Sequence, residues 1–280
     1  MTIKIITDGC ADLPLEMLQE HDITLVPLYV HFGHEQFTSN NLDSSYFYKR
    51  MKTEKELPKT SSPSPYEFYQ RYKEAGEDAD TLVFCTSSKL SSTYCHAVMG
   101  KDMLLEEGFK GNIEIFDTKT ASVGQARLII RAAEMAKEGF SYQEIISEIN
   151  KLIAESKIFF CLETLENVIK GGRLDRVRGT IASVLHIRLV MRADEEGKVD
   201  VYEKVRGTKN AMKRLIEIMG EKKHDLEKNI LGVAHGNCEE RARAFAEQVL
   251  QLYPFKKVIF ANMGPVIGTY GGEGAIVVSY

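Results

Sequence analysis

The sequence predicts an α/β protein in which a doubly wound parallel sheet is followed by a second α/β domain with a mixed sheet. Short runs rich in β-branched and aromatic residues alternate with helical patterns along the chain. The first of these runs are almost continuously apolar, which is typical of parallel strands that helices cover on both faces. Later, two extended runs flank a short segment around Gly197, a pattern that favours an antiparallel pair.

In the first part of the chain, predicted strands and helices alternate. The strands are residues 3–7, 25–32, 81–85 and 113–116. The helices are residues 13–20, 44–53, 65–75, 91–107, 122–139 and 142–154. Phe68, Tyr69 and Tyr72 recur at a spacing that places them on one helical face. The alternation predicts βαβ units, with a ligand crevice beyond the carboxyl ends of the strands.

The second part begins near residue 156 and is also α/β. Its predicted strands are residues 158–161, 188–193, 199–205, 230–234, 258–261 and 275–278, and its predicted helices are residues 209–219 and 239–252. We therefore expect an N-terminal Rossmann-like domain over residues 1–155 and a C-terminal mixed-sheet domain over residues 156–280. The ligand site is expected between the two domains.

The composition argues against several classes of protein. Of the 280 residues, 44% are hydrophobic and 27% are charged, which suits a globular protein with a core. The formal net charge is −4 and no basic cluster dominates, so we expect no nucleic-acid partner. The first apolar run stops at Asp8, too early for a secretory signal, and no stretch reaches the ~20 apolar residues of a membrane span. We expect a cytoplasmic protein with at most transient membrane contact.

The five cysteines and seven histidines are scattered along the chain. No C-x-x-C pair is present, so a cytoplasmic setting predicts reduced and mostly buried thiols. No grouping of His, Cys, Asp and Glu has the spacing of a zinc site, so we expect no bound metal.

Polar segments with many hydroxyl groups follow the predicted strands or precede helices: residues 7–9, 60–64, 86–93 and 117–122. Such groups at a helix N-terminus can bind an anion together with backbone N–H groups, but Ser and Thr are also favoured as simple helix caps. No glycine-rich phosphate loop is present. The pattern therefore leaves two interpretations, capping alone or a small anion site. For such a site, a single carboxylate suits neutral hydroxyls better than a polyphosphate does.

Two further segments have an unusual composition. Residues 264–274 are dense in glycine and are predicted as a loop before the last strand, either for close approach to a ligand or as a tight turn. Residues 170–179 carry four basic residues and one acid. They are predicted as a solvated surface loop or, alternatively, as a docking patch for an acidic or phosphorylated partner.

Several short motifs occur in a fixed order from residue 7 to about residue 274. They are Thr7-Asp8, Ala11-Asp12-Leu13-Pro14, Thr60-Ser61-Ser62-Pro63-Ser64, Leu90-Ser91-Ser92-Thr93-Tyr94, residues 117–125, Lys170-Gly171-Gly172-Arg173-Leu174 and Gly264-Pro265-Val266-Ile267-Gly268-Thr269. Each motif alone is weak, but their order along the chain resembles the DegV family of bacterial fatty-acid-binding proteins.

The resemblance implies two α/β domains and a buried tunnel that holds a long-chain fatty acid. The lipid-binding residues that it implies are Thr60 and Ser91 on the carboxylate, with Ser61, Ser92, Gly268, Thr269 and Tyr270 around them. Arg173 is expected near the head group or on a partner-facing surface. Members that serve a fatty acid kinase have no catalytic activity of their own and no cofactor beyond the bound fatty acid. The kinase brings ATP, and the acyl-phosphate goes on to phospholipid synthesis.

Some positions depart from the residues that are usual in this family. Tyr270 stands where a histidine of the carboxylate network is common, Ser92 and Gly9 replace a glycine and a serine, and Glu273 and Leu189 replace prolines. A phenol donates one hydrogen bond but does not take up a proton near neutral pH, as histidine does. We expect fatty-acid binding to survive these changes, whereas competence with a kinase depends on Tyr270.

Two catalytic alternatives use the same residues. In the first, Ser91 is the nucleophile of a serine-dependent lipid hydrolase with His96 or His235 as base, although no G-x-S-x-G segment surrounds Ser91. In the second, the chain is itself a kinase-like domain, because the family fold resembles part of dihydroxyacetone kinase, and His235 would carry the substrate.

Overall fold

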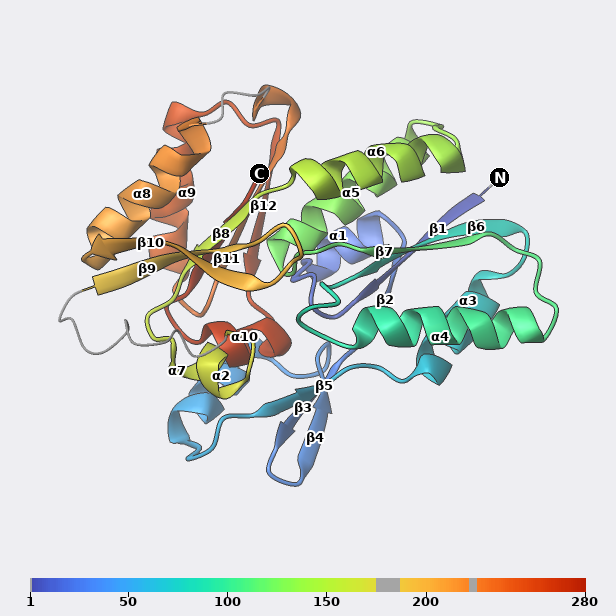
Figure 1. Cartoon of the computed structure of the whole chain (residues 1–280), viewed down its shortest axis with the longest axis horizontal. Helices are drawn as coiled ribbons and strands as arrows, with labels where there is room; N and C mark the ends of the chain where they lie inside the picture. The colour runs from blue at the N-terminus through green and yellow to red at the C-terminus, as the bar shows by residue number, and fades with distance from the viewer. Residues whose placement is uncertain (1, 175–186, 222–225) are drawn as a thin grey trace.

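The computed structural model describes residues 2–174, 187–221 and 226–280. The elements follow in the order β1 (Thr2–Asp8), α1 (Leu15–Glu20), β2 (Ile23–Val26), β3 (Tyr29–Phe32), β4 (Glu35–Thr38), α2 (Ser44–Thr53), β5 (Lys59–Ser61), α3 (Pro65–Ala75), β6 (Ala79–Cys85), α4 (Thr93–Glu106), β7 (Ile113–Asp117), α5 (Val123–Lys137), α6 (Tyr142–Glu155), β8 (Ile158–Cys161), α7 (Glu166–Lys170), β9 (Ile187–Ala193), β10 (Val199–Arg206), α8 (Thr208–Glu221), η1 (Leu226–Lys228), β11 (Ile230–His235), α9 (Glu239–Leu252), β12 (Lys257–Asn262), α10 (Pro265–Gly271) and β13 (Ile276–Ser279). Figure 1 shows two large sheets side by side and a small sheet below them.

The first part of the chain forms the predicted parallel sheet, with strand order β2-β1-β6-β7. Every position of β6 is buried, which explains its continuous apolar run. Leu82 and Phe84 face helix α5, whereas Val83 and Cys85 face helices α3 and α4. Helices therefore cover both faces of this sheet, as in a doubly wound fold, and the predicted fold class is confirmed.

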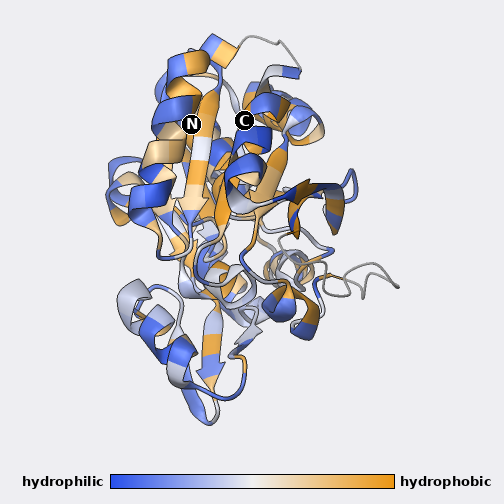
Figure 2. Cartoon of the chain, turned by 90° about the vertical axis from the view of Figure 1, so that its left-hand side faces the viewer, coloured by the Kyte–Doolittle hydropathy of each residue, from blue (hydrophilic) through white to orange (hydrophobic). Residues whose placement is uncertain are grey.

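The second part forms a mixed sheet with strand order β10-β9-β8-β13-β11-β12. Strands β11 and β12 are parallel, and the other pairs are antiparallel. The predicted hairpin is β9–β10. Asp194 closes its turn by accepting hydrogen bonds from the N–H groups of Glu196 and Lys198, both at 2.9 Å. Helices α8 and α9 pack on this sheet, and Figure 2 shows hydrophobic strands behind the more hydrophilic outer helices.

The predicted single strand over residues 25–32 is wrong. The chain leaves β2 after Val26, turns at Pro27 and Leu28, and continues as β3 in a separate antiparallel sheet of order β4-β3-β5. Proline has no N–H group to donate to a strand ladder, so it favours a break at this point. Strands β4 and β5 were not predicted, because with four and three residues they are too short to show a period.

The glycine-dense stretch, predicted as a loop, is a helix over residues 265–271. Pro265 occupies its first turn and Gly272 follows its end with φ of 72°, the positions where these residues are favoured. Gly268 has a packing role. A side-chain carbon there would lie 2.7 Å from the Tyr48 hydroxyl oxygen and 2.8 Å from Phe47 Cε1 on α2, so only glycine lets α10 approach α2 this closely.

Helix α5 lies between the two large sheets and packs on both of them. Its Arg127 is buried and donates from Nε to the Ile230 carbonyl at 2.5 Å, and from Nη1 to Ser156 Oγ at 3.1 Å and Ser279 Oγ at 3.0 Å. Burial lowers the pKa of Arg127 to about 10, so the side chain stays charged at neutral pH.

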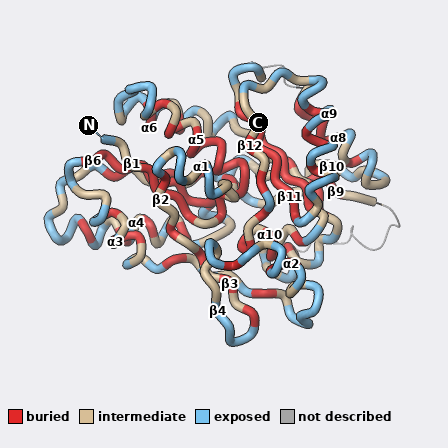
Figure 3. Tube along the Cα trace, turned by 180° about the vertical axis from the view of Figure 1, so that it is seen from behind, coloured by how far each residue is buried: buried red, intermediate tan, exposed pale blue. Residues whose placement is uncertain are grey.

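The buried residues gather in the two large sheets and in the helices next to them, as Figure 3 shows. Because α5 packs on both sheets, the predicted domain boundary after residue 155 stays a prediction. Within the described ranges, none of the helices combines the length and the apolar character that a bilayer crossing demands.

Replacing Arg127 by alanine is expected to lower the free energy of unfolding by about 2–4 kcal/mol. Three acceptors, two of them buried, would lose their donor, and a cavity would open beside α5. Urea denaturation measures this change. Arg131→Ala is the matched control in the same helix, where Arg131 forms a more exposed ion pair of 3.7 Å with Glu138, and it should cost less than about 1 kcal/mol. Equal losses in the two variants would contradict the role of Arg127 as a link.

Candidate functional site

A cavity lies between the carboxyl edge of the parallel sheet and the mixed sheet, and we refer to it as the central cavity. It holds about 890 Å³ of space outside the protein atoms, part of which is open to solvent. The segments that follow β1, β6 and β7 contribute Cys10, Thr86, Thr120, Ala121 and Ser122. The mixed sheet and its neighbours contribute mainly apolar side chains, among them Ile158, Phe160, Leu162, Val168 and Val277. This is the edge at which doubly wound sheets bind ligands.

One end of the central cavity is polar, and Thr60 and Tyr270 meet there. Thr60 Oγ1 and the Tyr270 hydroxyl are hydrogen bonded at 2.5 Å, although 210 residues separate them. Alternation along β5 directs Thr60 inward and leaves Ser61 exposed, where its Oγ pairs with His31 Nε2 at 3.0 Å. Thr60 and Tyr270 line the cavity, and Ser61 is not among the lining residues.

Ser91 reaches the same end from the segment between β6 and α4. It lines the central cavity, and its Oγ pairs with Thr93 Oγ1 at 2.8 Å. Ser92 is exposed and pairs with Ser62 Oγ at 2.7 Å, away from the lining residues. Ser92 occupies the N-cap position of α4 without making a side-chain cap, whereas Ser64 does cap α3. Capping therefore accounts for Ser64 but not for Thr60, whereas Ser91 Oγ accepts from the N–H group of Thr93 at 3.3 Å and also lines the cavity.

Arg173 adds a cation to the polar end. Its guanidinium lies 4.5 Å above the centre of the Tyr270 ring, and its Nε and Nη1 donate to the carbonyls of Leu90 at 3.1 Å and Gly171 at 2.7 Å. A side chain at Gly171 would overlap the Tyr270 ring, which explains the glycine before Arg173. Among the described residues that line the cavity, Arg173 is the only charged one. Residues 175–179 of the predicted basic patch lie outside the described residues.

Gly268 and Thr269 are buried in α10 and are not among the cavity-lining residues. Thr269 Oγ1 donates to the Pro265 carbonyl at 2.8 Å within the helix. With Gly268 packed on α2, both residues hold the helix that carries Tyr270. The structure thus brings Thr60, Ser91, Arg173 and Tyr270 together at one end of the cavity.

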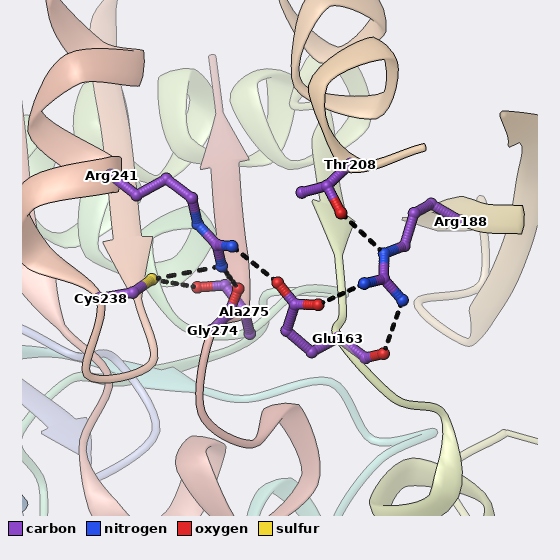
Figure 4. A network of polar contacts seen from close by, with 7 residues as sticks. All are labelled: Glu163, Arg188, Thr208, Cys238, Arg241, Gly274 and Ala275. Carbon is purple, nitrogen blue, oxygen red and sulfur yellow. Dashed lines mark hydrogen bonds and ion pairs between the residues drawn. The ribbon is translucent and has the colours of Figure 1, made fainter. Parts of the chain in front are cut away.

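An ion-pair network supports the segments that carry Arg173 and Tyr270 (Figure 4). Glu163, just before α7, binds Arg241 and Arg188 through its two carboxylate oxygens, each at 2.6 Å. Arg241 also donates to the Gly274 carbonyl just beyond α10, and Arg188 donates to the Glu163 carbonyl at 3.0 Å. The network therefore ties the start of the α7 segment to the chain that leaves α10.

Two carboxylates hold segments that line the central cavity, and no separate functional role was predicted for either of them. Asp8 is buried and accepts hydrogen bonds from the N–H groups of Cys10 at 2.8 Å and Thr86 at 2.6 Å. Burial raises the pKa of Asp8, and these hydrogen bonds oppose the rise. The sequence feature that could have identified Asp8 is the Thr7-Asp8 pair at the end of the first strand.

Asp12 connects the first part of the chain to the second. It accepts from Ser122 Oγ at 2.5 Å and from the Gly264 N–H at 2.7 Å, just before α10. Desolvation raises the pKa of Asp12 to about 7, although both hydrogen bonds favour its charged form. Asp12 also adopts a left-handed conformation with φ of 48°.

Neither histidine proposed for the catalytic alternatives hydrogen bonds to Ser91. His96 Nδ1 lies 2.7 Å from the Pro63 carbonyl, which can only accept, so this nitrogen carries the proton. His235 is buried, and its Nδ1 accepts from the Cys238 N–H at 3.2 Å. Across residues 2–174, 187–221 and 226–280, no group of three or more His, Cys, Asp and Glu side chains could hold a metal.

Comparisons with known proteins identify the family. The model of the DegV family, described as uncharacterised, matches residues 2–280. Protein DegV of Bacillus subtilis is 32% identical and the alignment covers 99% of this chain and 98% of the relative. A DegV-family structure from Ruminococcus gnavus, refined with vaccenic acid, has a TM-score of 0.93, 27% identity and full coverage of both chains. DegV of B. subtilis, described as a fatty acid binding protein, has a TM-score of 0.86 and 31% identity, with 100% of this chain and 98% of that chain covered. The chain belongs to the DegV family.

Because of Asp12, the free energy of unfolding is expected to fall as the pH rises from about 4 to about 7. Its pKa is about 7 in the folded chain against an ordinary value of 3.8, so the folded state binds the proton more tightly within this interval. Asp12→Asn should flatten this part of the stability curve, because asparagine stays neutral and the Ser122 hydroxyl can accept from its amide.

Urea denaturation between pH 4.5 and 7.5 tests this expectation. Asp22→Asn is the control, because Asp22 is an exposed carboxylate that pairs with Lys4. In Asp22→Asn the free energy of unfolding should change with pH as steeply as in the parent protein over this interval. An unchanged slope in Asp12→Asn would contradict the expectation.

Proposed function

We propose that this protein binds a long-chain fatty acid in the central cavity with the carboxylate at the polar end. The observation that carries the proposal is the distribution of side chains: a mostly apolar cavity has its one described cation, Arg173, beside the hydroxyls of Thr60, Ser91 and Tyr270. The other hydroxyls that line it, those of Thr86, Thr120 and Ser122, come from the segments after β6 and β7 and have no cation beside them among the described lining residues. Each methylene that leaves water gains about 0.8 kcal/mol, so the acyl tail would supply most of the affinity. A few fixed polar groups then suffice to orient the head group.

Each polar residue has a distinct role in this proposal. Thr60 and Ser91 donate hydrogen bonds to the carboxylate, and Arg173 offsets its charge at short range. Tyr270 holds Thr60 through the 2.5 Å hydrogen bond and supports the Arg173 guanidinium on its ring. The vaccenic acid of the R. gnavus structure and the description of B. subtilis DegV as a fatty acid binding protein support the same ligand class.

The protein is further proposed to act in the cytoplasm as a carrier without catalysis of its own. A partner fatty acid kinase would transfer phosphate from ATP to the bound carboxylate, and the acyl-phosphate would serve phospholipid synthesis. Three features support a carrier. The sequence has no phosphate-binding loop, Ser91 has no histidine partner in the described part of the chain, and Arg173 is partly exposed beside the polar end. Ligand-free protein that neither binds palmitic acid nor gains thermal stability from it would refute the central proposal.

Thr60→Ala and Ser91→Ala are each expected to weaken palmitic acid binding about 5- to 30-fold, because the carboxylate loses one hydrogen-bond donor. Isothermal titration of delipidated protein measures the change. Ser61→Ala and Ser92→Ala are matched controls, since both neighbours are exposed and lie outside the cavity lining. The sequence-based prediction that Ser61 and Ser92 also bind the lipid would require all four variants to weaken binding similarly.

Arg173→Ala is expected to slow acyl-phosphate formation by a purified bacterial fatty acid kinase, even when the variant is saturated with palmitic acid. The carboxylate would lose the cation that fixes its position for phosphoryl transfer. Trapping of the acyl-phosphate with hydroxylamine measures the rate. Lys170→Ala is the control, because Lys170 is an exposed cation of the same segment that pairs with Glu166. Palmitoyl-phosphate formed without the kinase would contradict the carrier role.

A further inference from the structure

A second hollow opens on the surface beside the β9–β10 hairpin, and we refer to it as the outer hollow. Its walls come from residues 118–120 after β7, from the junction of α6 and β8, and from residues 192–196 at the hairpin, with Tyr202 and Tyr280 behind them. It holds about 1750 Å³ outside the protein atoms, a figure that includes open solvent. Nothing in the proposed carrier function uses this space.

The outer hollow and the central cavity share a thin partition. Thr120, Ile158 and Ala193 line both spaces, so the partition is one side chain thick at these positions. Ala193 contributes only a methyl group and is partly exposed. A hydrogen bond of 2.8 Å from Ser87 Oγ to the Gly197 carbonyl ties the hairpin turn beyond it to the segment after β6. The partition is therefore narrow, and at Ala193 it consists of a single methyl group.

The partition lies at the end of the central cavity that is remote from Arg173. Leu162, Phe160 and Ile158 alternate along β8 on its cavity face. The Leu162 end continues to α7 and Arg173, whereas the Ile158 end begins at Lys157 beside the outer hollow. Strands rise about 3.3 Å per residue, so this line of side chains covers about 13 Å. An acyl chain with its carboxylate at the polar end therefore points its terminal carbon at the partition.

Two lysines border the outer hollow without a partner for their ammonium groups among the described residues: Lys119 and Lys157. Their backbones are fixed. Lys157 exchanges backbone hydrogen bonds of 3.2 and 3.1 Å with Tyr280, and the Lys119 N–H donates to Asp117 at 3.1 Å.

Most of the acids around the hollow are already engaged. Asp194 closes the hairpin turn, Glu196 pairs with Lys198 at 2.8 Å, and Glu221 pairs with Arg214 at 2.6 Å. The cation of Arg192 is likewise taken by Asp200 at 3.2 Å. Asp194 and Glu195 have no cation partner among the described residues, since Asp194 accepts only from backbone N–H groups. Lys119 and Lys157 therefore offer two unpaired ammonium groups beside two carboxylates, and a further carboxylate that enters this space can pair with them.

We propose that the central cavity extends past the partition into the outer hollow, and that the protein takes long-chain fatty acids with a second carboxylate at the ω-end, held by Lys119 and Lys157. The proposal rests on the proposed fatty-acid-binding function. One carboxylate occupies the polar end, the methylene chain fills the apolar cavity, and the other carboxylate emerges among the lysines.

Whether a diacid can bind depends on whether the central cavity is closed or open at Ala193. In a cavity sealed by apolar side chains, an ω-carboxylate would be buried without a partner, and its desolvation would prevent binding. In a cavity that opens at Ala193, the same group stays hydrated and meets the two ammonium groups. Hexadecanedioic acid and palmitic acid have equal chain lengths and differ only at this end, so the pair distinguishes the two cases.

The experiment compares hexadecanedioic acid with palmitic acid by isothermal titration of the delipidated full chain. We expect their dissociation constants to agree within about tenfold, a difference of about 1.4 kcal/mol. A diacid that binds more than about a thousandfold more weakly than palmitic acid would overturn the proposal. Failure of palmitic acid itself to bind would instead refute the proposed function, so the two failures are distinguishable.

Two sets of variants locate the second carboxylate. Lys119→Gln combined with Lys157→Gln should weaken diacid binding about tenfold and leave palmitic acid binding unchanged, whereas Lys213→Gln on the exposed face of α8 should change neither.

Ala193→Phe should block the passage and reduce diacid binding. Ala154→Phe is its control, because it adds the same bulk to the outer hollow away from the partition. Equal effects on both acids in the lysine variant would overturn the proposal, even if Ala193→Phe fails to fold.

Discussion

The polar end of the central cavity depends on the contacts of Tyr270, where three distant segments meet. Its hydroxyl binds Thr60 from the small sheet, its ring supports Arg173, and its edge packs on Gly171. The position of the ring depends in turn on Gly268, which lets α10 lie against α2. Without these close approaches, the hydroxyls and the cation would not converge. The proposed head-group site is thus a consequence of helix packing, since no single loop contains it.

The sequence predicts those parts of the fold that local patterns determine. Helices 44–53, 65–75 and 239–252 and strand 158–161 occur with the predicted bounds, because amphipathic spacing and caps such as Ser64 are local signals. The small sheet and α10 were missed. Three-residue strands have no period, and high glycine content hides a helix whose stability comes from tertiary packing.

The sequence likewise predicts some residues of the candidate site and misses others. Thr60 and Ser91 were marked by hydroxyl-rich segments and by the family resemblance, whereas the neighbours Ser61 and Ser92 share the composition but face outward. Only strand alternation in β5 separates Thr60 from Ser61, and a three-residue strand leaves no periodic pattern from which it could be predicted. The roles of Asp8 and Asp12 were also hidden. Their partners are backbone N–H groups and a serine far along the chain, which no local pattern reveals.

Tyr270 in place of the family's common histidine is compatible with the proposed transfer. A fatty-acid carboxylate has an ordinary pKa of about 4 to 5, so it is already ionised near neutral pH and needs no base to attack phosphorus. The carrier has only to orient the carboxylate and offset its charge. Thr60 and Ser91 provide donors, Arg173 provides the charge, and the Tyr270 hydroxyl fixes Thr60. Proton uptake, the property in which histidine differs from tyrosine, belongs to no step of the proposed transfer.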